Sequence, residues 1–226
     1  MSRRHRLCAI ALLAFAPAAL VNAAETGTAS HTIYLVRHGM YDLVEKADDK
    51  TANALNALGR EQAAFVADRL ATLPVKFTSI TTSQFTRARE TGDIIAAKLG
   101  ATCLRDALLN ECTPPGMGVA PTAIEAGAAA QLQQAWARFA VPTPAAATHD
   151  VLVCHGNVIR WFVCQALGVD LHQWSRMEIA NASLTVITVR SDGTTRLNVF
   201  SDTGHLPIAK QTWSGQGPGW AKPAAK

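Results

Sequence analysis

Residues 31–39, HTIYLVRHG, and residues 150–156, DVLVCHG, decide the fold of this chain. Each is a short run of apolar and β-branched residues that ends in His-Gly, a pattern typical of a buried strand with a polar side chain at its carboxyl end. Helical patterns separate the two runs, so the sequence predicts an α/β fold with a mostly parallel sheet between helical layers. Ligands of such sheets bind at the carboxyl ends of the strands, where both His-Gly steps fall.

Periodicity and turn residues predict the remaining elements. Further strands are expected over residues 77–81, 101–104, 183–190 and 196–201, and helices over residues 56–73, 83–99, 122–139 and 157–167. Ser83 is the expected cap of the second helix. Asp192-Gly193 predicts a hairpin between the last two strands, so the sheet is expected to be mixed. The prediction is a three-layer αβα sandwich with loops over 40–53 and 106–121 and an irregular tail from about residue 205.

Composition indicates a chain that can bury a core. Of its 226 residues, 49% are hydrophobic and only 17% are charged, which excludes a disordered chain. The net charge of +4 depends on the N-terminus, because residues 1–23 hold three arginines and no acid. The remaining 18 basic and 17 acidic residues nearly cancel. No basic patch is therefore expected, which argues against a nucleic-acid partner. Nothing in the sequence decides the oligomeric state.

Residues 1–23 are predicted to be a signal peptide. Basic residues within 2–6 precede an apolar run over 7–21, and a small-residue cleavage site follows. The run is short and contains Pro17, so an uncleaved membrane anchor is the less favoured alternative, and Sec and twin-arginine export both stay open. We expect a mature domain, residues 24–226, that is periplasmic or secreted and free of the membrane after cleavage.

The cysteines do not form a disulfide framework or a zinc pattern. Cys103, Cys112, Cys154 and Cys164 are scattered through the predicted mature domain. Free or buried thiols are favoured, and a disulfide between Cys103 and Cys112 is left open. No cysteine and histidine spacing suits a metal ion, so no metal and no cofactor are predicted.

Four side chains are expected to gather at the carboxyl edge of the sheet, and their chemistry suits a phosphoryl group. They are Arg37, His38, Arg87 and His155. Guanidinium forks match phosphoryl oxygens, and a neutral imidazole attacks phosphorus without a metal. Neighbouring arginines disfavour the imidazolium and so keep His38 neutral. The leaving oxygen needs a proton, and Glu111 in the second loop is the candidate acid.

Five motifs in a fixed order resemble the histidine phosphatase superfamily, whose phosphoglycerate-mutase-like members share this fold. They are RHG at 37–39, LGREQA at 58–63, SQFTRARET at 83–91, LNE at 109–111 and VCHGN at 153–157. The resemblance runs from about residue 31 to residue 206. It implies a metal-independent phosphatase that forms a phosphohistidine at His38. It also implies that Arg37, Arg87 and His155 bind the phosphoryl group and that Glu111 is the acid.

Within that superfamily the chain is most similar to the mitochondrial phosphoglycerate-mutase-like Ser/Thr phosphatases. Residues 155–164, HGNVIRWFVC, and residues 201–204, SDTG, carry this likeness. It implies hydrolysis of phosphoserine and phosphothreonine in proteins, with small phosphate esters as the alternative substrates. Met40 and Val44 stand where true mutases have an acidic residue and an asparagine, so a mutase is not expected. The predicted export signal departs from the mitochondrial branch.

Other readings of the same residues stay open. Cys154 and Arg160 have the Cys-x5-Arg spacing of thiol phosphatases, in which a thiolate attacks phosphorus. A non-catalytic phosphate-binding module is a second alternative. Arg87 has a plain reading as a surface arginine, and Asn157 either contacts phosphate or caps its helix. Structural roles are expected for His5, His31, His149, His172 and His205.

Overall fold

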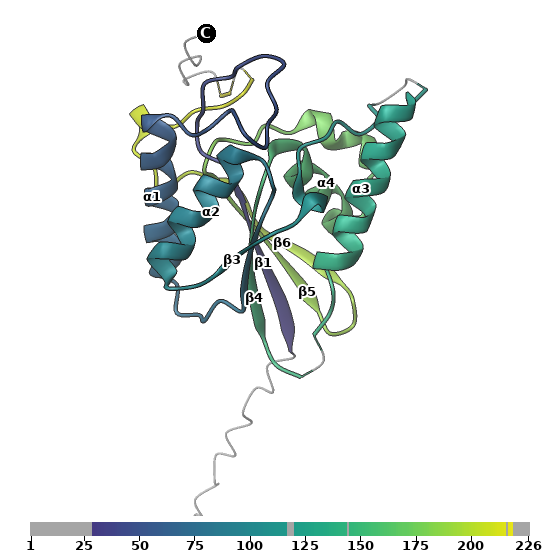
Figure 1. Cartoon of the computed structure of the whole chain (residues 1–226). Coiled ribbons are helices and arrows are strands. Elements are labelled where there is room, and N and C mark those ends of the chain that lie inside the picture. The colour runs from purple at the N-terminus through teal and green to yellow at the C-terminus, as the bar shows by residue number, and fades with distance from the viewer. Residues whose placement is uncertain (1–28, 117–119, 144, 216, 219–226) are drawn as a thin grey trace, which may run out of the picture.

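A computed structural model describes residues 29–116, 120–143, 145–215 and 217–218 and contains six strands around which four helices pack (Figure 1). The strands are β1 (Ser30–Arg37), β2 (Ser79–Thr82), β3 (Cys103–Arg105), β4 (Thr148–Cys154), β5 (Leu184–Arg190) and β6 (Thr195–Asp202). The helices are α1 (Ala57–Ala71), α2 (Thr86–Leu99), α3 (Ala123–Phe139) and α4 (Gly156–Leu167). Short 3-10 helices cover Ala107–Leu109, Leu171–Arg176 and Ile208–Lys210.

The sheet is mixed, as predicted, and its strand order is β3-β2-β4-β1-β5-β6. The first four strands of that order, β3, β2, β4 and β1, run parallel to one another, whereas β5 is antiparallel to both β1 and β6. β1 and β4 lie at the centre, so their carboxyl ends meet side by side. The three-layer αβα prediction is confirmed: α1 and α2 cover one face of the sheet, and α3 and α4 cover the other (Figure 1).

Alternation along the central strands builds the two halves of the core. In β1, Ile33 and Leu35 belong to the cluster under α3 and α4, whereas Tyr34 and Val36 belong to the cluster under α1 and α2. Successive strand side chains point to opposite faces, and both faces are covered, so a continuous apolar run is required here. Among the described residues, no helix is both long and apolar enough to cross a bilayer.

The second helix begins later than the sequence indicates. α2 starts at Thr86, and its N-cap residue is Phe85, without a side-chain cap. The expected cap, Ser83, lies two residues before Phe85 and accepts a hydrogen bond from the Phe85 N–H at 3.1 Å. Ser83 therefore holds the turn between β2 and α2, and its hydroxyl is available to the residues at the strand ends. The four cysteines of the described chain, residues 103, 112, 154 and 164, are free, so the disulfide left open is not formed.

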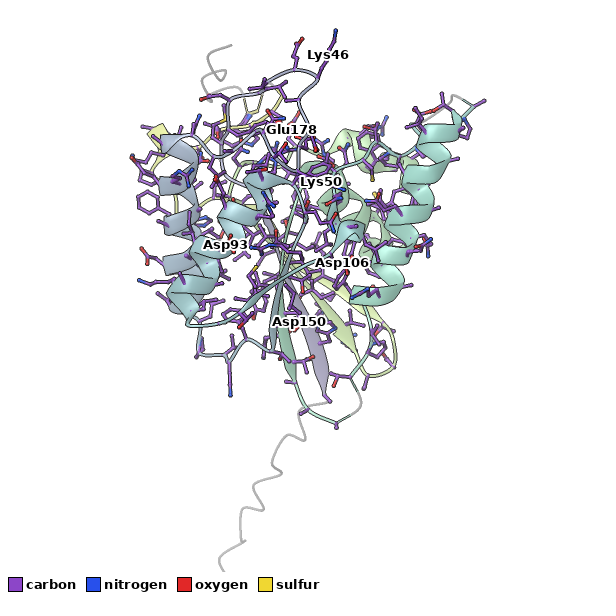
Figure 2. All side chains as sticks on the ribbon, in the orientation of Figure 1. Lys46, Lys50, Asp93, Asp106, Asp150 and Glu178 are labelled. Carbon is purple, nitrogen blue, oxygen red and sulfur yellow. The ribbon has the colours of Figure 1, made fainter. Side chains whose placement is uncertain are left out.

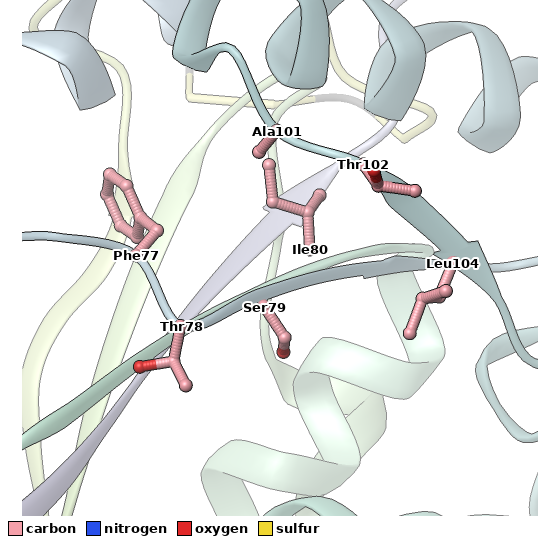
Figure 3. Close-up of a pocket in the computed structure, with 7 residues that line it drawn as sticks. All are labelled: Phe77, Thr78, Ser79, Ile80, Ala101, Thr102 and Leu104. Atoms are coloured by element: carbon pink, nitrogen blue, oxygen red, sulfur yellow. The ribbon is translucent and has the colours of Figure 1, made fainter.

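A cavity of about 250 Å³ lies away from the carboxyl ends of the strands, beside the start of β2 (Figure 3). Residues 77–80 line one side of it, and Ala101, Thr102 and Leu104 line the other. The lining contains no ionisable side chain, so this cavity cannot supply the acid, base or charge that phosphoryl chemistry requires.

Candidate active site

The central strand pair brings the two His-Gly steps together. Arg37 in β1 is the register partner of Cys154 in β4, and the His38 N–H donates to the Cys154 carbonyl at 3.0 Å. A histidine directly follows the last residue of each strand, and the ring centroids of His38 and His155 are 5.0 Å apart. Both side chains are almost fully buried, at 2% and 0% exposure. Two histidines from segments more than 100 residues apart thus share one small polar site.

His38 is held as a neutral ring with one unprotonated nitrogen. Its Nδ1 lies 2.8 Å from the carbonyl oxygen of Gly39, which can only accept, so Nδ1 carries the proton and Nε2 keeps its lone pair. Burial, followed by the charges of Arg37 and Arg87, places the pKa of His38 well below its ordinary value. The Asn181 side-chain amide donates to the His38 carbonyl at 3.1 Å and fixes the backbone there.

Two buried guanidinium groups flank this ring. Arg87, in the first turn of α2, is 4% exposed and directs its Nε toward His38 Nε2 at 3.4 Å. Its burial excludes the plain reading of a surface arginine. Arg37 is 6% exposed and donates to the Ile179 carbonyl and to the Ser214 hydroxyl, while its Nε is buried without a partner in the described structure. Buried donors without partners are costly, so they indicate a place where an anion is accepted.

His155 is oriented by Ser83. Asn110 Oδ1 accepts from the Gln84 N–H at 2.8 Å, which fixes the amide, and the Ser83 hydroxyl donates to the same oxygen at 2.9 Å. The Ser83 oxygen therefore accepts from His155 Nε2 at 2.8 Å, and the Nδ1 of a neutral His155 keeps a lone pair. Burial, His38 and the two arginines together lower the pKa of His155 well below its ordinary value.

Glu111 reaches the same site from the loop after the 3-10 helix Ala107–Leu109. Its Oε1 accepts from the Asn157 N–H at 3.3 Å, in the first turn of α4. A side chain built on Gly156 would lie 3.9 Å from Arg37 Nε and 4.0 Å from Glu111 Oε2, so the glycine leaves open the space between the two groups. Burial raises the pKa of Glu111 despite the opposing charges of Arg37 and Arg87. A carboxyl with a raised pKa is suited to hold and donate a proton.

The 40–53 loop contributes groups that the sequence analysis missed. Asp49 accepts from Arg87 Nη1 in an ion pair, and its backbone carbonyl accepts from the Thr86 N–H at 2.8 Å. The Arg87 guanidinium carbon lies 4.6 Å from the centroid of the Tyr41 ring and 5.2 Å from that of Phe85. Aromatic faces attract a cation and hold its plane. No local motif marks Asp49, because its role depends on how the loop folds back onto α2.

The cysteine of the alternative reading is not placed to attack. Cys154 is fully buried in the apolar cluster that includes Leu152 and Ile159. Burial, together with the charge of Glu111, raises the pKa of its thiol, which opposes the thiolate that such a mechanism needs. Asn157 does not cap its helix, because the N-cap residue of α4 is His155, whose side chain makes no cap hydrogen bond. Instead, the Asn157 Nδ2 donates to the Cys112 carbonyl at 3.0 Å, and its Oδ1 accepts from Arg160.

The histidines expected to be structural that lie in the described chain have partners of their own. His31 contacts Asp150 at 2.9 Å, and His149 contacts the Tyr34 hydroxyl at 3.3 Å. Figure 2 shows Asp150 toward the opposite end of the molecule from Glu178 and Lys50. His172 pairs with Asp170 and His205 with the Ala182 carbonyl, while His5 lies outside the described residues. Within the described chain, no group of three or more His, Cys, Asp or Glu residues could hold a metal ion.

Comparisons with known proteins agree on one family. The family described as histidine phosphatase superfamily (branch 1) matches residues 33–149 and 129–203. The serine/threonine-protein phosphatase Pgam5, mitochondrial, of Caenorhabditis elegans is 37% identical over 194 residues, which cover 81% of this chain and 66% of that protein. Its counterpart from Homo sapiens is 36% identical over 201 residues, which cover 82% of this chain and 67% of that protein. The matched region thus spans about two thirds of these relatives.

Solved structures of related fold match most of the chain. A phosphoglycerate mutase from Plasmodium falciparum has a TM-score of 0.57 and 26% identity, covering 79% of this chain and 95% of the other. A putative alpha-ribazole-5′-P phosphatase from Escherichia coli has a TM-score of 0.64 and 16% identity, covering 76% of this chain and 96% of the other. The second likeness, at this identity, concerns the fold alone.

One prediction is wrong against these relatives. The sequence analysis predicted a signal peptide and a periplasmic or secreted protein, whereas the similar phosphatases are named as mitochondrial. The prediction rested on residues 1–23, which lie outside the described residues. A basic and apolar N-terminus is a compositional signal, and composition alone did not identify the compartment.

Proposed function

This chain belongs to the histidine phosphatase superfamily, and from that premise we propose that it hydrolyses phosphate monoesters through a phosphohistidine at His38. The observation that carries the proposal is the neutral His38 ring, whose Nε2 keeps a lone pair between two buried guanidinium groups. An unprotonated nitrogen can attack phosphorus, and the guanidinium groups can neutralise the oxygens around it.

In the first step, His38 Nε2 attacks phosphorus in line with the ester oxygen. The N–P bond forms while the P–O bond to the leaving group breaks, and Glu111 delivers its proton to the leaving oxygen. Arg37 Nε and the free donors of Arg87 hold the phosphoryl oxygens. The proton that the substrate monoanion carries on a phosphoryl oxygen passes to Nδ1 of His155, which then donates to that oxygen and returns the proton when phosphate leaves.

In the second step, water replaces the leaving group. Glu111, now a carboxylate, takes a proton from that water, and the water oxygen attacks phosphorus. The N–P bond breaks, and inorganic phosphate and neutral His38 result. Glu111 ends the cycle protonated, so each group returns to its starting state. No step requires a metal ion or another cofactor.

The relatives' names support phosphoserine and phosphothreonine in proteins as the substrates. A serine or threonine phosphate stands on a slender side chain, which suits a nucleophile that is only 2% exposed. Small phosphate esters are the alternative, and a panel of phosphopeptides and small esters separates the two. Selective hydrolysis of the small esters would overturn the protein-phosphatase assignment while leaving the chemistry unchanged.

The mechanism is tested by trapping the intermediate. A ³²P-labelled phosphomonoester is mixed with the protein in chelator, the reaction is quenched at high pH, and acid-labile, base-stable label is measured. The wild type and Cys154→Ser are expected to carry label and to turn over, whereas His38→Ala is expected to do neither. Loss of both signals in Cys154→Ser alone would overturn the proposal in favour of the thiol mechanism.

A further inference from the structure

A third arginine lies on the leaving-group side of the site. Arg160 is one turn along α4 from Gly156, and its Nη1 donates to Asn157 Oδ1 at 2.9 Å. The backbone N–H of the same Asn157 donates to Glu111 Oε1 at 3.3 Å. On the proposed function Glu111 faces the ester oxygen, so Asn157 ties Arg160 to the place where the leaving group departs. The inference below rests on that function.

The Arg160 guanidinium is only partly satisfied. Its Nε is buried and has no hydrogen-bond partner in the described structure. Its Nη2 lies 3.8 Å from Glu178 Oε2, which is beyond hydrogen-bond range, and the Glu178 side chain is 51% exposed. Such a loose pair with an exposed carboxylate contributes little and is readily replaced. Arg160 itself is 19% exposed, so it is both sheltered and reachable.

An aromatic wall stands beside this guanidinium. The Arg160 guanidinium carbon is 5.9 Å from the centroid of the Trp174 ring, within range of a cation–π contact. Trp174 is held in turn, because its Nε1 donates to the Pro115 carbonyl at 2.8 Å. Figure 2 shows Glu178, the neighbour of Arg160, at the end of the molecule where the catalytic strands terminate. Arg160 and Trp174 therefore place a charge and an aromatic ring beside the Asn157 backbone that binds Glu111.

The charge of Arg160 is surplus to the phosphoryl group. Arg37 and Arg87 already flank His38. Burial lowers the pKa of Arg37, Glu111 opposes that shift, and the charge of Arg160 lowers the pKa further. Placing a third cation there raises the energy of the empty site unless a further anion arrives. Loose pairing with Glu178 meets that need only in part.

We propose that Arg160, Asn157 and Trp174 form a leaving-group subsite that binds a second anionic group. The preferred substrates are then phosphomonoesters whose leaving group also carries a carboxylate, on a flat or apolar frame. An acidic residue beside a phosphoserine meets this description, and so does a small phosphorylated acid. The shared chemistry is the carboxylate.

Two matched aryl phosphates test the subsite. 4-Carboxyphenyl phosphate and 4-carbamoylphenyl phosphate have nearly the same shape and differ in one charge. We expect wild-type kcat/KM to favour the carboxylate about tenfold, mainly through KM, as one charge-assisted contact allows. Arg160→Gln is expected to bring the ratio close to one, and Arg160→Lys to keep part of it. Arg196→Gln, an exposed arginine on β6, changes the net charge equally and should leave the ratio unchanged.

A wild-type ratio near one would overturn the subsite, and so would a ratio that survives in Arg160→Gln. Equal losses in Arg160→Gln and Arg196→Gln would assign the preference to overall charge instead. The same pair is also titrated calorimetrically into His38→Ala, where turnover cannot occur. A carboxylate preference there supports the subsite even if the wild type hydrolyses neither ester, which would instead refute the proposed function. A phosphoserine peptide pair, with aspartate or asparagine as the next residue, shows whether peptides use the same contact.

Discussion

At the residue scale, the proposed acid role of Glu111 predicts that its proton matters most for a poor leaving group. Burial raises the pKa of Glu111, so the carboxyl is protonated at a higher pH than an exposed glutamate, and activity should fall as pH rises through that value. Glu111→Gln is expected to lower kcat/KM, which reports the first step, about 100-fold for an alkyl phosphate and far less for 4-nitrophenyl phosphate. The same substitution should also remove the fall in activity at high pH from the pH profile measured with the alkyl phosphate. Equal losses for the two leaving groups would contradict the acid role.

The ion pair between Asp49 and Arg87 makes a second residue-scale prediction. The carboxylate already occupies Arg87 Nη1, so an arriving phosphate has to share or displace it. Asp49→Asn keeps the oxygen that accepts from Arg87 and removes the charge. Inhibition by inorganic phosphate should therefore tighten about three- to tenfold, as measured by its inhibition constant at fixed ionic strength. Weaker inhibition would mean that the Asp49 charge positions Arg87 rather than competing with phosphate.

At the element scale, the start of α1 packs closely against the turn that follows His38. A Cβ on Gly59 would lie 1.9 Å from the Met40 carbonyl oxygen, and one on Gly39 would lie 2.4 Å from the Gly59 carbonyl oxygen. Both glycines are therefore required by close approach of the two backbones. Nearby, the Gln62 side chain accepts from the Met40 N–H at 2.8 Å, so α1 also fixes the turn after His38.

Two glycine-to-alanine changes in helices should have opposite effects. Gly59→Ala should lower the free energy of unfolding by about 1–3 kcal/mol, because the methyl group overlaps backbone. Gly127→Ala in α3, where no atom lies within 4 Å of an added Cβ, should raise it by about 0.5–1 kcal/mol through helix propensity. Denaturant unfolding followed by circular dichroism measures both, and a stable Gly59→Ala would refute the contact.

At the scale of the whole molecule, a buried carboxylate links three strands at the end of the sheet opposite to the proposed active site. Asp150 near the start of β4 binds His31 of β1 at 2.9 Å and Ser79 of β2 at 2.9 Å, so one carboxylate joins three adjacent strands. Burial alone would lower the pKa of His31, but the Asp150 hydrogen bond raises it overall. Burial alone would raise the pKa of Asp150, but hydrogen bonds from His31 and Ser79 lower it overall.

The sign of the pH dependence follows from these shifts. The stabilisation from His31 is fully present below the pKa that His31 has in the unfolded chain, and it is lost as pH rises through its pKa in the folded protein. The stabilisation from Asp150 is present above the unfolded-state pKa of Asp150 and is lost as pH falls through its folded-state pKa. Asp150→Asn should cost about 1–3 kcal/mol at about pH 5.5 and clearly less at about pH 9. Thermal or urea unfolding at both values measures this. Specific activity should not change, and a loss of activity would show that the two ends are coupled.

The order of strands and helices, and the clustering of chemistry at the strand ends, were predictable because they depend on local patterns. Continuous apolar runs specify doubly covered strands, and parallel strands place their last residues at one edge. Arg37, His38, Arg87, Glu111 and His155 could therefore be placed together, although nothing local located Asp49, Ser214 or Asn181 against them. Those contacts depend on how loops and the segment after β6 fold back.

By itself, the sequence determined the fold class, the central strand pair and the residue types that meet there, since hydrophobic periodicity and covalent order are sufficient for these. Only the tertiary structure decided the tautomer of His38, the burial of Arg87, the displacement of Ser83 from cap to partner of His155, and the Arg160 Nε without a hydrogen-bond partner. Proton positions, desolvation and unpaired donors depend on which groups surround an atom in space. Those neighbours come from segments that lie far apart along the chain.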